Sequence, residues 1–138
     1  MKNSMKLEFP AVSENEPFAR GVVAAFCLRL NPTLDELSDV KTAVSEAVTN
    51  CIVHAYKNRG GEIVVKATLS DNQLHIGIID GGVGIPDIKK AREAYYTTAT
   101  SGERAGIGFT VMEAFMDKLD VVGNEKGGIS VFMDKKLA

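Results

Sequence analysis

The order of the predicted elements places this 138-residue chain in the α+β class. Two amphipathic helices precede a β-hairpin, and a further helix precedes two closing strands. This order favours a two-layer sandwich in which helices cover one face of a mostly antiparallel sheet. The length suits one domain, and because no repeat or linker divides the sequence, residues 1–138 are expected to form a single domain.

The first strand and helix are predicted from turn and cap residues near the start of the chain. Residues 6–9 can form a short edge strand. Ser13 and Glu16 have the spacing of a capping box, and Pro17 then falls in the first turn of a helix. Apolar residues recur at helical spacing as far as Leu30, where this helix is expected to end.

A second and longer helix is predicted after Asn31 and Pro32, which interrupt the first one. Thr33 and Glu36 form another capping-box pattern at its start, and the Gly-containing stretch at residues 57–61 is expected to end it. The β-branched residues in between also suit a strand, but the length and the cap favour a helix.

The predicted hairpin consists of strands at residues 62–69 and 73–79, joined by a turn at residues 70–72. Apolar residues alternate on one face of its second strand, as expected when only that face is buried. These residues are Leu74, Ile76 and Ile78.

The C-terminal part of the chain is predicted as helix, loop, helix and two strands. Residues 87–95 suit a short helix, residues 96–106 a loop, and residues 109–119 a helix with apolar residues at helical spacing. Strands are expected at residues 120–122 and 129–133.

The composition excludes several classes of partner. The formal charge of -2 comes from 16 basic and 18 acidic residues that are well mixed, so no basic stripe is available for nucleic acid. No run approaches the length of a membrane span, and residues 1–10 lack the apolar core of a signal peptide. A cytoplasmic protein is expected. Cys27 and Cys51 fall in apolar patterns without metal-type spacing, so buried free thiols are expected.

Polar residues share one stripe of the second helix. Glu46, Asn50 and His54 are spaced four residues apart, with Thr42 one turn earlier, and the flanking stripes are apolar. Polar groups in such a place need partners, and a Mg²⁺ ion bound to phosphates would supply one. Asn50 is therefore a candidate metal ligand. A lone histidine such as His54 is more often structural than catalytic.

A glycine-rich string follows the hairpin. Asp80 stands at the end of the second strand, and Gly82 and Gly84 allow backbone angles and close ligand approach that other residues do not. Taken alone, an ordinary Asp-Gly turn explains this string better. A Rossmann motif is excluded because no βαβ unit surrounds the glycines.

A second glycine-bearing segment runs directly into the helix predicted at residues 109–119. Gly106 and Gly108 precede Phe109, and the N–H groups of a helix N-terminus can bind phosphate without a Walker lysine. A flexible connector is the simpler reading of this segment in isolation. The three signals in this order are more informative than any one of them.

The order Glu46/Asn50, Asp80-x-Gly82-x-Gly84 and Gly106-x-Gly108-Phe109 resembles the N, G1 and G2 boxes of the GHKL ATP-binding superfamily, which includes gyrase, Hsp90, histidine kinases and MutL. In detail the motifs look most like those of the bacterial anti-sigma factor serine kinases, above all the sporulation members. The resemblance covers nearly the whole chain and implies the Bergerat fold and binding of ATP or ADP with Mg²⁺.

The resemblance also implies a role for each matching residue. Asn50 would bind Mg²⁺, Asp80 would accept a hydrogen bond from the adenine amino group, and Glu46 would be the general base. The other residues that the resemblance places at the nucleotide are Gly82, Gly84, Thr98, Arg104, Gly106, Gly108 and Phe109.

The implied partners are a sporulation sigma factor, which the protein would inhibit, and an anti-anti-sigma protein, whose serine would receive the phosphate. A homodimer is implied as well. Arg20, on the first helix, is a candidate partner contact, and a solvated arginine explains it equally well.

The sequence departs from the family pattern at two positions. Ala99 stands where relatives often have the lysine that enters the lid, and Gly128 where they have a threonine near the last strand. Three alternatives stay open: a nucleotide-gated sigma-binding module with negligible kinase activity, a stress-response anti-sigma kinase of the RsbW type, and a free-standing ATPase like the Hsp90 or MutL head.

Overall fold

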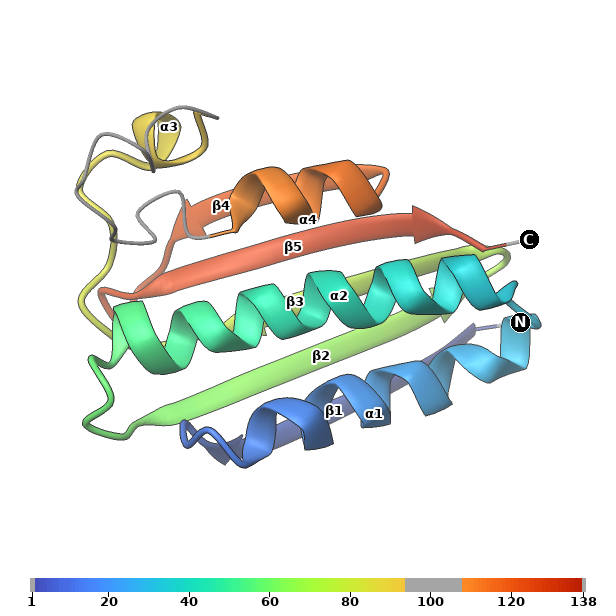
Figure 1. The fold of residues 1–138 in the computed structure, drawn as a ribbon, viewed down its shortest axis with the longest axis horizontal. Coiled ribbons are helices and arrows are strands. Elements are labelled where there is room, and N and C mark those ends of the chain that lie inside the picture. Colours follow the sequence, from blue (N-terminus) through green and yellow to red (C-terminus); the bar gives the residue numbers. More distant parts are fainter. Residues whose placement is uncertain (1, 94–107, 138) are drawn as a thin grey trace.

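The computed structural model describes residues 2–93 and 108–137, and within them antiparallel strands form one sheet in the order β1-β2-β3-β5-β4 (Figure 1). Across the sheet these strands are β1 (Lys2–Pro10), β2 (Glu62–Ser70), β3 (Gln73–Ile79), β5 (Ile129–Lys136) and β4 (Lys118–Gly123). The predicted hairpin is confirmed as β2 and β3. The predicted edge strand is confirmed as β1, which is longer than expected because its whole length pairs with β2.

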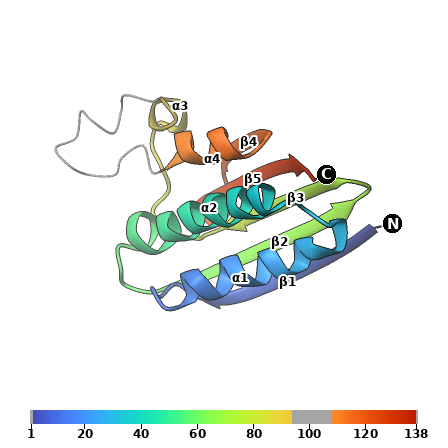
Figure 2. The ribbon, with the colours of Figure 1, turned by 45° about the vertical axis from the view of Figure 1, so that its right-hand side comes forward.

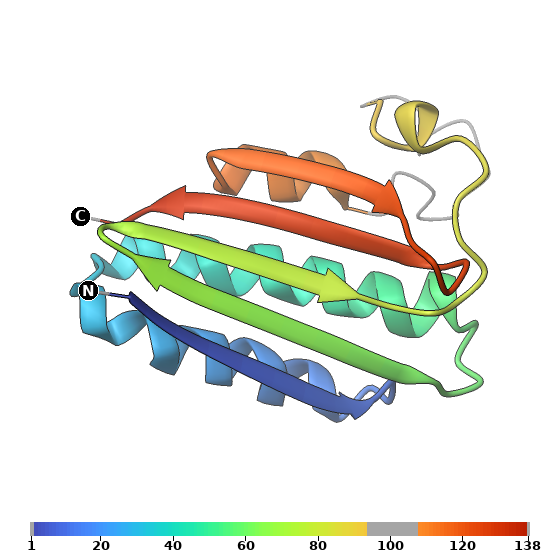
Figure 3. The ribbon, with the colours of Figure 1, turned by 180° about the vertical axis from the view of Figure 1, so that it is seen from behind.

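Helices cover one face of this sheet, as Figures 1 and 3 show from its two sides. The helix α1 (Asn15–Cys27) continues as a 3₁₀ turn at Leu28–Leu30, and α2 (Leu34–Asn50) continues as a π-helical turn at Cys51–Ala55. Later in the chain come α3 (Ile88–Ala91) and α4 (Phe109–Phe115). The predicted α+β sandwich with helices on one face is therefore confirmed.

The core lies between α2 and the helix-facing side of the sheet. In β3 the side chains that alternate toward the helices are 0–2% exposed, as the sequence pattern predicts; they are Leu74, Ile76 and Ile78. Ile76 pairs with Met133 of β5, and Ile78 pairs with Val131. Burying one such side chain stabilises a fold by about 1.5–3 kcal/mol, so this layer fixes α2 firmly over the sheet.

The start of α2 confirms the predicted capping box. Thr33 Oγ1 accepts a hydrogen bond from Glu36 N at 3.1 Å, and Glu36 Oε1 accepts one from Thr33 N at 2.8 Å. Asn31 has a φ of 54°, in the left-handed region, and so ends the preceding 3₁₀ turn. Without the capping box, the N–H groups of Thr33 and Glu36 would lack a partner within the helix.

The capping box predicted for α1 is wrong. The helix begins at Asn15, and Glu14 occupies the N-cap without a side-chain cap. Asn15 Nδ2 instead donates to Pro10 O at 2.9 Å, and Asn15 N donates to Val12 O. These local bonds tie the helix to the end of β1, so Ser13 lies in the turn that precedes the helix.

The helix predicted at residues 109–119 is shorter than expected. It ends at Phe115, because Met116 is extended (φ -110°, ψ 159°), and Leu119 belongs to β4. Leu119 points into the core from a strand, so its apolar position fits a helical and a strand pattern equally well. The helix predicted at residues 87–95 is also short: within the described residues it is α3, which Asp87 caps through Lys90 N.

One end of the molecule gathers the elements that carry the predicted site. The C-terminal end of α2, the end of β3, the β4–β5 turn and the start of α4 lie together at the left of Figure 1, far from both chain termini, and the turned view in Figure 2 agrees. Among the described helices, none combines the length and the apolar character that a membrane span requires.

Candidate functional site

The predicted polar stripe on α2 is present. Thr42, Glu46 and Asn50 are half-buried, whereas Val44 and Val48 beside them are fully buried against the sheet. After Asn50 the helix widens into the π-helical turn, a feature that is frequent at functional sites. The stripe therefore brings one carboxylate and one carboxamide to the edge of the core.

Glu46 meets the start of α4. Gly108 is the N-cap of α4, with a φ of 67°, and the Glu46 carboxylate lies so close to it that any Cβ there would overlap Oε1. Glycine is required here by its backbone angle and by this contact. The structure thus joins two motifs that are more than 50 residues apart in the sequence.

Asp80 is a buried carboxylate, 5% exposed, at the end of β3. Its Oδ1 accepts hydrogen bonds from Gly82 N at 2.9 Å and from Ile129 N at 3.1 Å. Burial together with the Asp80 carboxylate raises the pKa of the neighbouring Cys51 thiol well above its ordinary value. Cys51 therefore stays protonated, and Asp80 is held in one orientation by bonds to fixed backbone.

Asn124 ties the β4–β5 turn to the backbone of Asp80. Its Nδ2 donates to Asp80 O at 2.9 Å and to Ser130 Oγ at 3.1 Å. Its Oδ1 accepts from Lys126 N and from Gly128 N, at 3.0 and 3.2 Å. One carboxamide thus fixes both the turn and the strand end that carries the carboxylate.

Gly82 and Gly84, which follow Asp80, are each required for a different steric reason. A Cβ at Gly82 would overlap the Ala55 carbonyl, which also accepts a hydrogen bond from Val83 N at 3.0 Å. Gly84 has a φ of 75°, and a Cβ there would lie 2.7 Å from Gly127 O. These two glycines let the loop pack directly on the end of α2 and on the β4–β5 turn.

The structure explains the glycine at position 128 by packing. A Cβ at Gly128 would overlap the Asp80 backbone and come within 2.5 Å of its Oδ1. A threonine could not occupy this place without moving the carboxylate. Polar groups around Asp80 come instead from Asn124 and from Ser130, which is itself 5% exposed.

A cavity of about 250 Å³ opens between the end of α2, the Asp80 loop, α3, α4 and β5. Its volume lies just below the usual range for small-molecule sites. Four of the residues predicted for the nucleotide line it: Asn50, Asp80, Gly84 and Phe109. His54, Cys51 and Lys57 line it as well, and most of the remaining wall is apolar.

Glu46 and Arg20 line a different hollow. They share a groove of about 430 Å³ between α1 and α2, together with Leu34 and Thr42. Glu46 therefore stands on the same stripe as Asn50, one turn away, but beside the groove rather than in the cavity. Gly82 and Gly108 do not line the cavity, and both act in the packing of the loops around it.

Three predicted residues cannot be placed. Thr98, Arg104 and Gly106 lie outside the described residues, as does the departure at Ala99. In the part that is described, no three His, Cys, Asp or Glu side chains gather as metal ligands.

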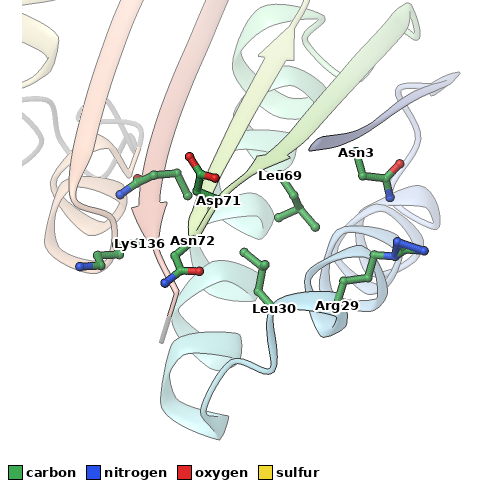
Figure 4. Close-up of a pocket in the computed structure, with 8 residues that line it drawn as sticks. Asn3, Arg29, Leu30, Leu69, Asp71, Asn72 and Lys136 are labelled. Carbon is green, nitrogen blue, oxygen red and sulfur yellow. The ribbon is translucent and has the colours of Figure 1, made fainter. Parts of the chain in front are cut away.

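A third hollow, larger than the cavity and the groove, lies at the opposite end of the molecule, near the chain termini (Figure 4). It has a volume of about 540 Å³ and is lined by Asn3, Arg29, Lys136 and residues of the β2–β3 turn. Figure 4 shows Arg29 and Lys136 on opposite sides, with Leu30 and Leu69 between them. Since its charged groups do not converge, it is the poorer candidate for a nucleotide.

Sequence reasoning missed two residues that shape the cavity's rim. Asn124 and Tyr56 bind the backbone of the Asp80 loop through their side chains. Tyr56 Oη contacts Gly81 N, 25 residues away in the chain, and Asn124 contacts Asp80 O, 44 residues away. No local pattern in the sequence signals such pairs.

Comparison with known proteins supports this assignment of the fold. Residues 9–135 match the family model described as histidine kinase-like ATPase domain. In the solved structures, the RsbU and RsbW domains of a Mycobacterium tuberculosis protein share the fold, with a TM-score of 0.69 and 18% identity over 98% of this chain and 32% of that one.

Curated relatives are much closer in sequence. An anti-sigma F factor of Caldanaerobacter subterraneus subsp. tengcongensis is 53% identical over 96% of this chain and 93% of its own length. Anti-sigma F factors of Clostridium acetobutylicum and Bacillus licheniformis are 50% and 48% identical over 100% of this chain, and over 96% and 95% of their own lengths. The chain therefore belongs to the histidine kinase-like ATPase (GHKL) family and, within it, to the anti-sigma F factors.

Proposed function

We propose that this protein binds ATP with Mg²⁺ in the cavity, phosphorylates a serine of an anti-anti-sigma protein, and binds and inhibits sigma F. The observation that carries the proposal is the arrangement on α2. Asn50 faces the cavity that Asp80 closes, and Glu46, one turn earlier, faces the neighbouring groove. A nucleotide on one side and a protein hydroxyl on the other would meet at this stripe.

Asp80 is the proposed adenine contact. Both backbone N–H groups that bind its carboxylate use Oδ1, so its second oxygen is the one that would accept from the adenine amino group. The apolar wall, which includes Ile85 and Val131, suits the flat faces of a base.

Asn50 is the proposed protein ligand of Mg²⁺. A carboxamide oxygen is a hard donor, and Mg²⁺ usually takes only one or two ligands from the protein beside phosphates and water. When bound, the ion would neutralise charge on the phosphates. Gly108 and Phe109 at the start of α4, with Thr98, Arg104 and Gly106, are proposed to complete the phosphate site.

Glu46 is the proposed general base. Its carboxylate would take the proton from the partner's serine hydroxyl while the serine oxygen attacks the γ-phosphorus and ADP leaves. A positioned base contributes about 10² to 10⁴ in rate. The closeness of Gly108 supports this role, because it places the carboxylate beside the proposed phosphate site.

The groove between α1 and α2 is the proposed partner surface. Arg20 is 41% exposed at its side chain and pairs with Glu16 at 3.4 Å, and Leu34 is 85% exposed. Arginine is enriched at protein interfaces and among the residues that contribute most to binding, and the exposed leucine adds apolar surface beside it. We expect Arg20→Ala to reduce capture of sigma F in a pull-down with ADP and with ATP. Unchanged capture in both would remove Arg20 from the interface.

We propose that a second copy of the chain packs on the open face of the sheet, which is the face that the helices do not cover. Phe132 and Val122 lie there, 44% and 45% exposed. Light scattering should give twice the monomer mass, and a Phe132→Glu variant should give the monomer mass. A monomeric wild type would contradict the homodimer. We place this assembly in the cytoplasm, where sigma factors act.

Transfer of labelled phosphate tests the kinase directly. With γ-labelled ATP and Mg²⁺, the wild type should label an anti-anti-sigma protein, and a partner whose acceptor serine is replaced by alanine should stay unlabelled. ATP binding without labelling would favour the nucleotide-gated module instead. Rapid phosphate release without any partner would favour a free-standing ATPase.

A further inference from the structure

Tyr56, directly after the π-helical turn of α2, bonds to two separate segments of the chain. Its Oη donates to Glu62 O at 2.7 Å, at the start of β2, and accepts from Gly81 N at 2.6 Å, in the Asp80 loop. The tyrosine hydroxyl has a single hydrogen. Because this hydrogen points to Glu62 O, the oxygen presents a lone pair to Gly81 N. One hydroxyl therefore connects α2, β2 and the loop.

The ring of Tyr56 packs against Gly61. Gly61 has a φ of 156°, and a Cβ there would come within 2.6 Å of three ring atoms, so the ring lies directly over this glycine. Burial raises the pKa of Tyr56 above its ordinary value. The side chain thus stays protonated at neutral pH, and it keeps the donor that the bond to Glu62 requires.

The same end of α2 holds the loop at a second point. Ala55 O accepts a hydrogen bond from Val83 N at 3.0 Å, so two consecutive residues, Ala55 and Tyr56, bind the loop on either side of Gly82. Asp80 comes directly before the amide that Tyr56 binds. The peptide plane between Asp80 and Gly81 therefore depends on the tyrosine hydroxyl.

We infer that Tyr56 is a positioning residue for adenine recognition, which it serves by fixing the peptide that follows Asp80. This inference rests on the proposed binding of ATP at Asp80. The loop is then held on one side by Tyr56 and on the other by Asn124, whose Nδ2 binds Asp80 O. With both in place the carboxylate is oriented before the nucleotide arrives, which lowers the cost of ordering on binding.

Tyr56→Phe tests the inference, because it removes the hydroxyl and keeps the ring over Gly61. Calorimetry should show ATP binding weakened about three- to tenfold, the range for one hydrogen bond. Because guanine carries an oxygen where adenine carries its amino group, the preference for ATP over GTP should narrow as well. Asp80→Asn changes the carboxylate that would bind the adenine amino group. It should therefore show the largest decrease in the ratio of ATP affinity to GTP affinity, and it serves as the reference.

Thr33→Ala is the matched control, since it removes side-chain hydrogen bonding at the far end of α2. It should lower the melting temperature while leaving ATP affinity and the ATP to GTP ratio unchanged. The inference would be overturned if Tyr56→Phe bound ATP as tightly as the wild type. It would also be overturned if Thr33→Ala lost as much ATP affinity as Tyr56→Phe. Failure of the wild type to bind ATP would instead refute the proposed function.

Hydrogen exchange of the wild type provides a second measurement should Tyr56→Phe not fold. The Gly81 amide belongs to an exposed residue, yet it should exchange slowly with nucleotide bound, because the tyrosine oxygen accepts it. Exchange at the rate of a free amide would overturn the inference.

Discussion

Single atoms decide which glycines of the Asp80 loop can change. At Gly82 an added methyl group would meet the backbone of Ala55, which cannot move aside as a flexible side chain would. At Gly81 the same methyl group would only make ordinary contacts of 3.5 Å. The sequence shows neighbouring glycines of equal appearance, and only the packing of the loop on α2 distinguishes them.

Gly82→Ala should therefore damage both the fold and the site. We expect a loss of about 1–3 kcal/mol in the free energy of unfolding, the usual cost of overpacking, and weaker ATP binding because the loop must shift. Urea unfolding and calorimetry measure the two effects. Gly21→Ala on α1 is the matched control, since a methyl group there meets nothing within 4 Å. Equal behaviour of the two variants would show that the loop does not depend on this contact.

Residues could be predicted where their partners are near in the chain. Thr33 and Glu36 satisfy each other within one turn, and their spacing alone revealed the cap. The residues that orient Asp80 could not be found in this way, because Tyr56 and Asn124 reach it from distant segments. The resemblance gave the candidate site residues their proposed roles, because the motifs of a family carry such distant pairings within them.

For helices and strands, existence and type were predicted better than the exact boundaries. The hairpin and α2 have sustained patterns, so their existence and type followed from periodicity. Errors fell at the ends of elements, as at the start of α1 and the end of α4. At these positions a few local hydrogen bonds decide the boundary. A buried residue such as Leu119 also fits both the helical and the strand spacing of apolar residues.

The π-helical turn at Cys51–Ala55 is an element that periodicity could not reveal. It follows the metal-ligand position predicted at Asn50 and places His54 and Cys51 at the cavity. Its last residue, Ala55, also binds the Asp80 loop through its carbonyl group. The distortion thus lies where α2 changes from a packed core helix into the wall of the site.

The whole molecule buries two thiols, Cys27 and Cys51, in agreement with the sequence. Burial raises the pKa of Cys27 from 9.0 to about 12. The folded protein therefore keeps this proton at a pH where the unfolded chain loses it. The contribution of Cys27 to the free energy of unfolding is therefore fully present below about pH 9 and is lost as the pH rises toward 12.

Alkaline unfolding should show this dependence. Between about pH 8 and pH 10.5, the free energy of unfolding in urea should fall more steeply for the wild type than for Cys27→Ala, which has no thiol at this position. The variant should be less stable at pH 8, because the alanine leaves a small cavity. Parallel slopes for the two proteins would contradict a buried, protonated Cys27.

At the scale of the molecule, the central claim is that α2 separates a nucleotide cavity from a partner groove and carries the catalytic carboxylate between them. The most direct measurement is phosphate transfer from labelled ATP to the anti-anti-sigma partner by Glu46→Gln. Asp39→Asn, the same chemical change on the same helix at a residue that pairs with Lys135, is its control.

Glu46→Gln should bind ATP with wild-type affinity and label the partner about 10² to 10⁴ times more slowly, while Asp39→Asn should label it at the wild-type rate. Labelling by Glu46→Gln at the wild-type rate would contradict the account.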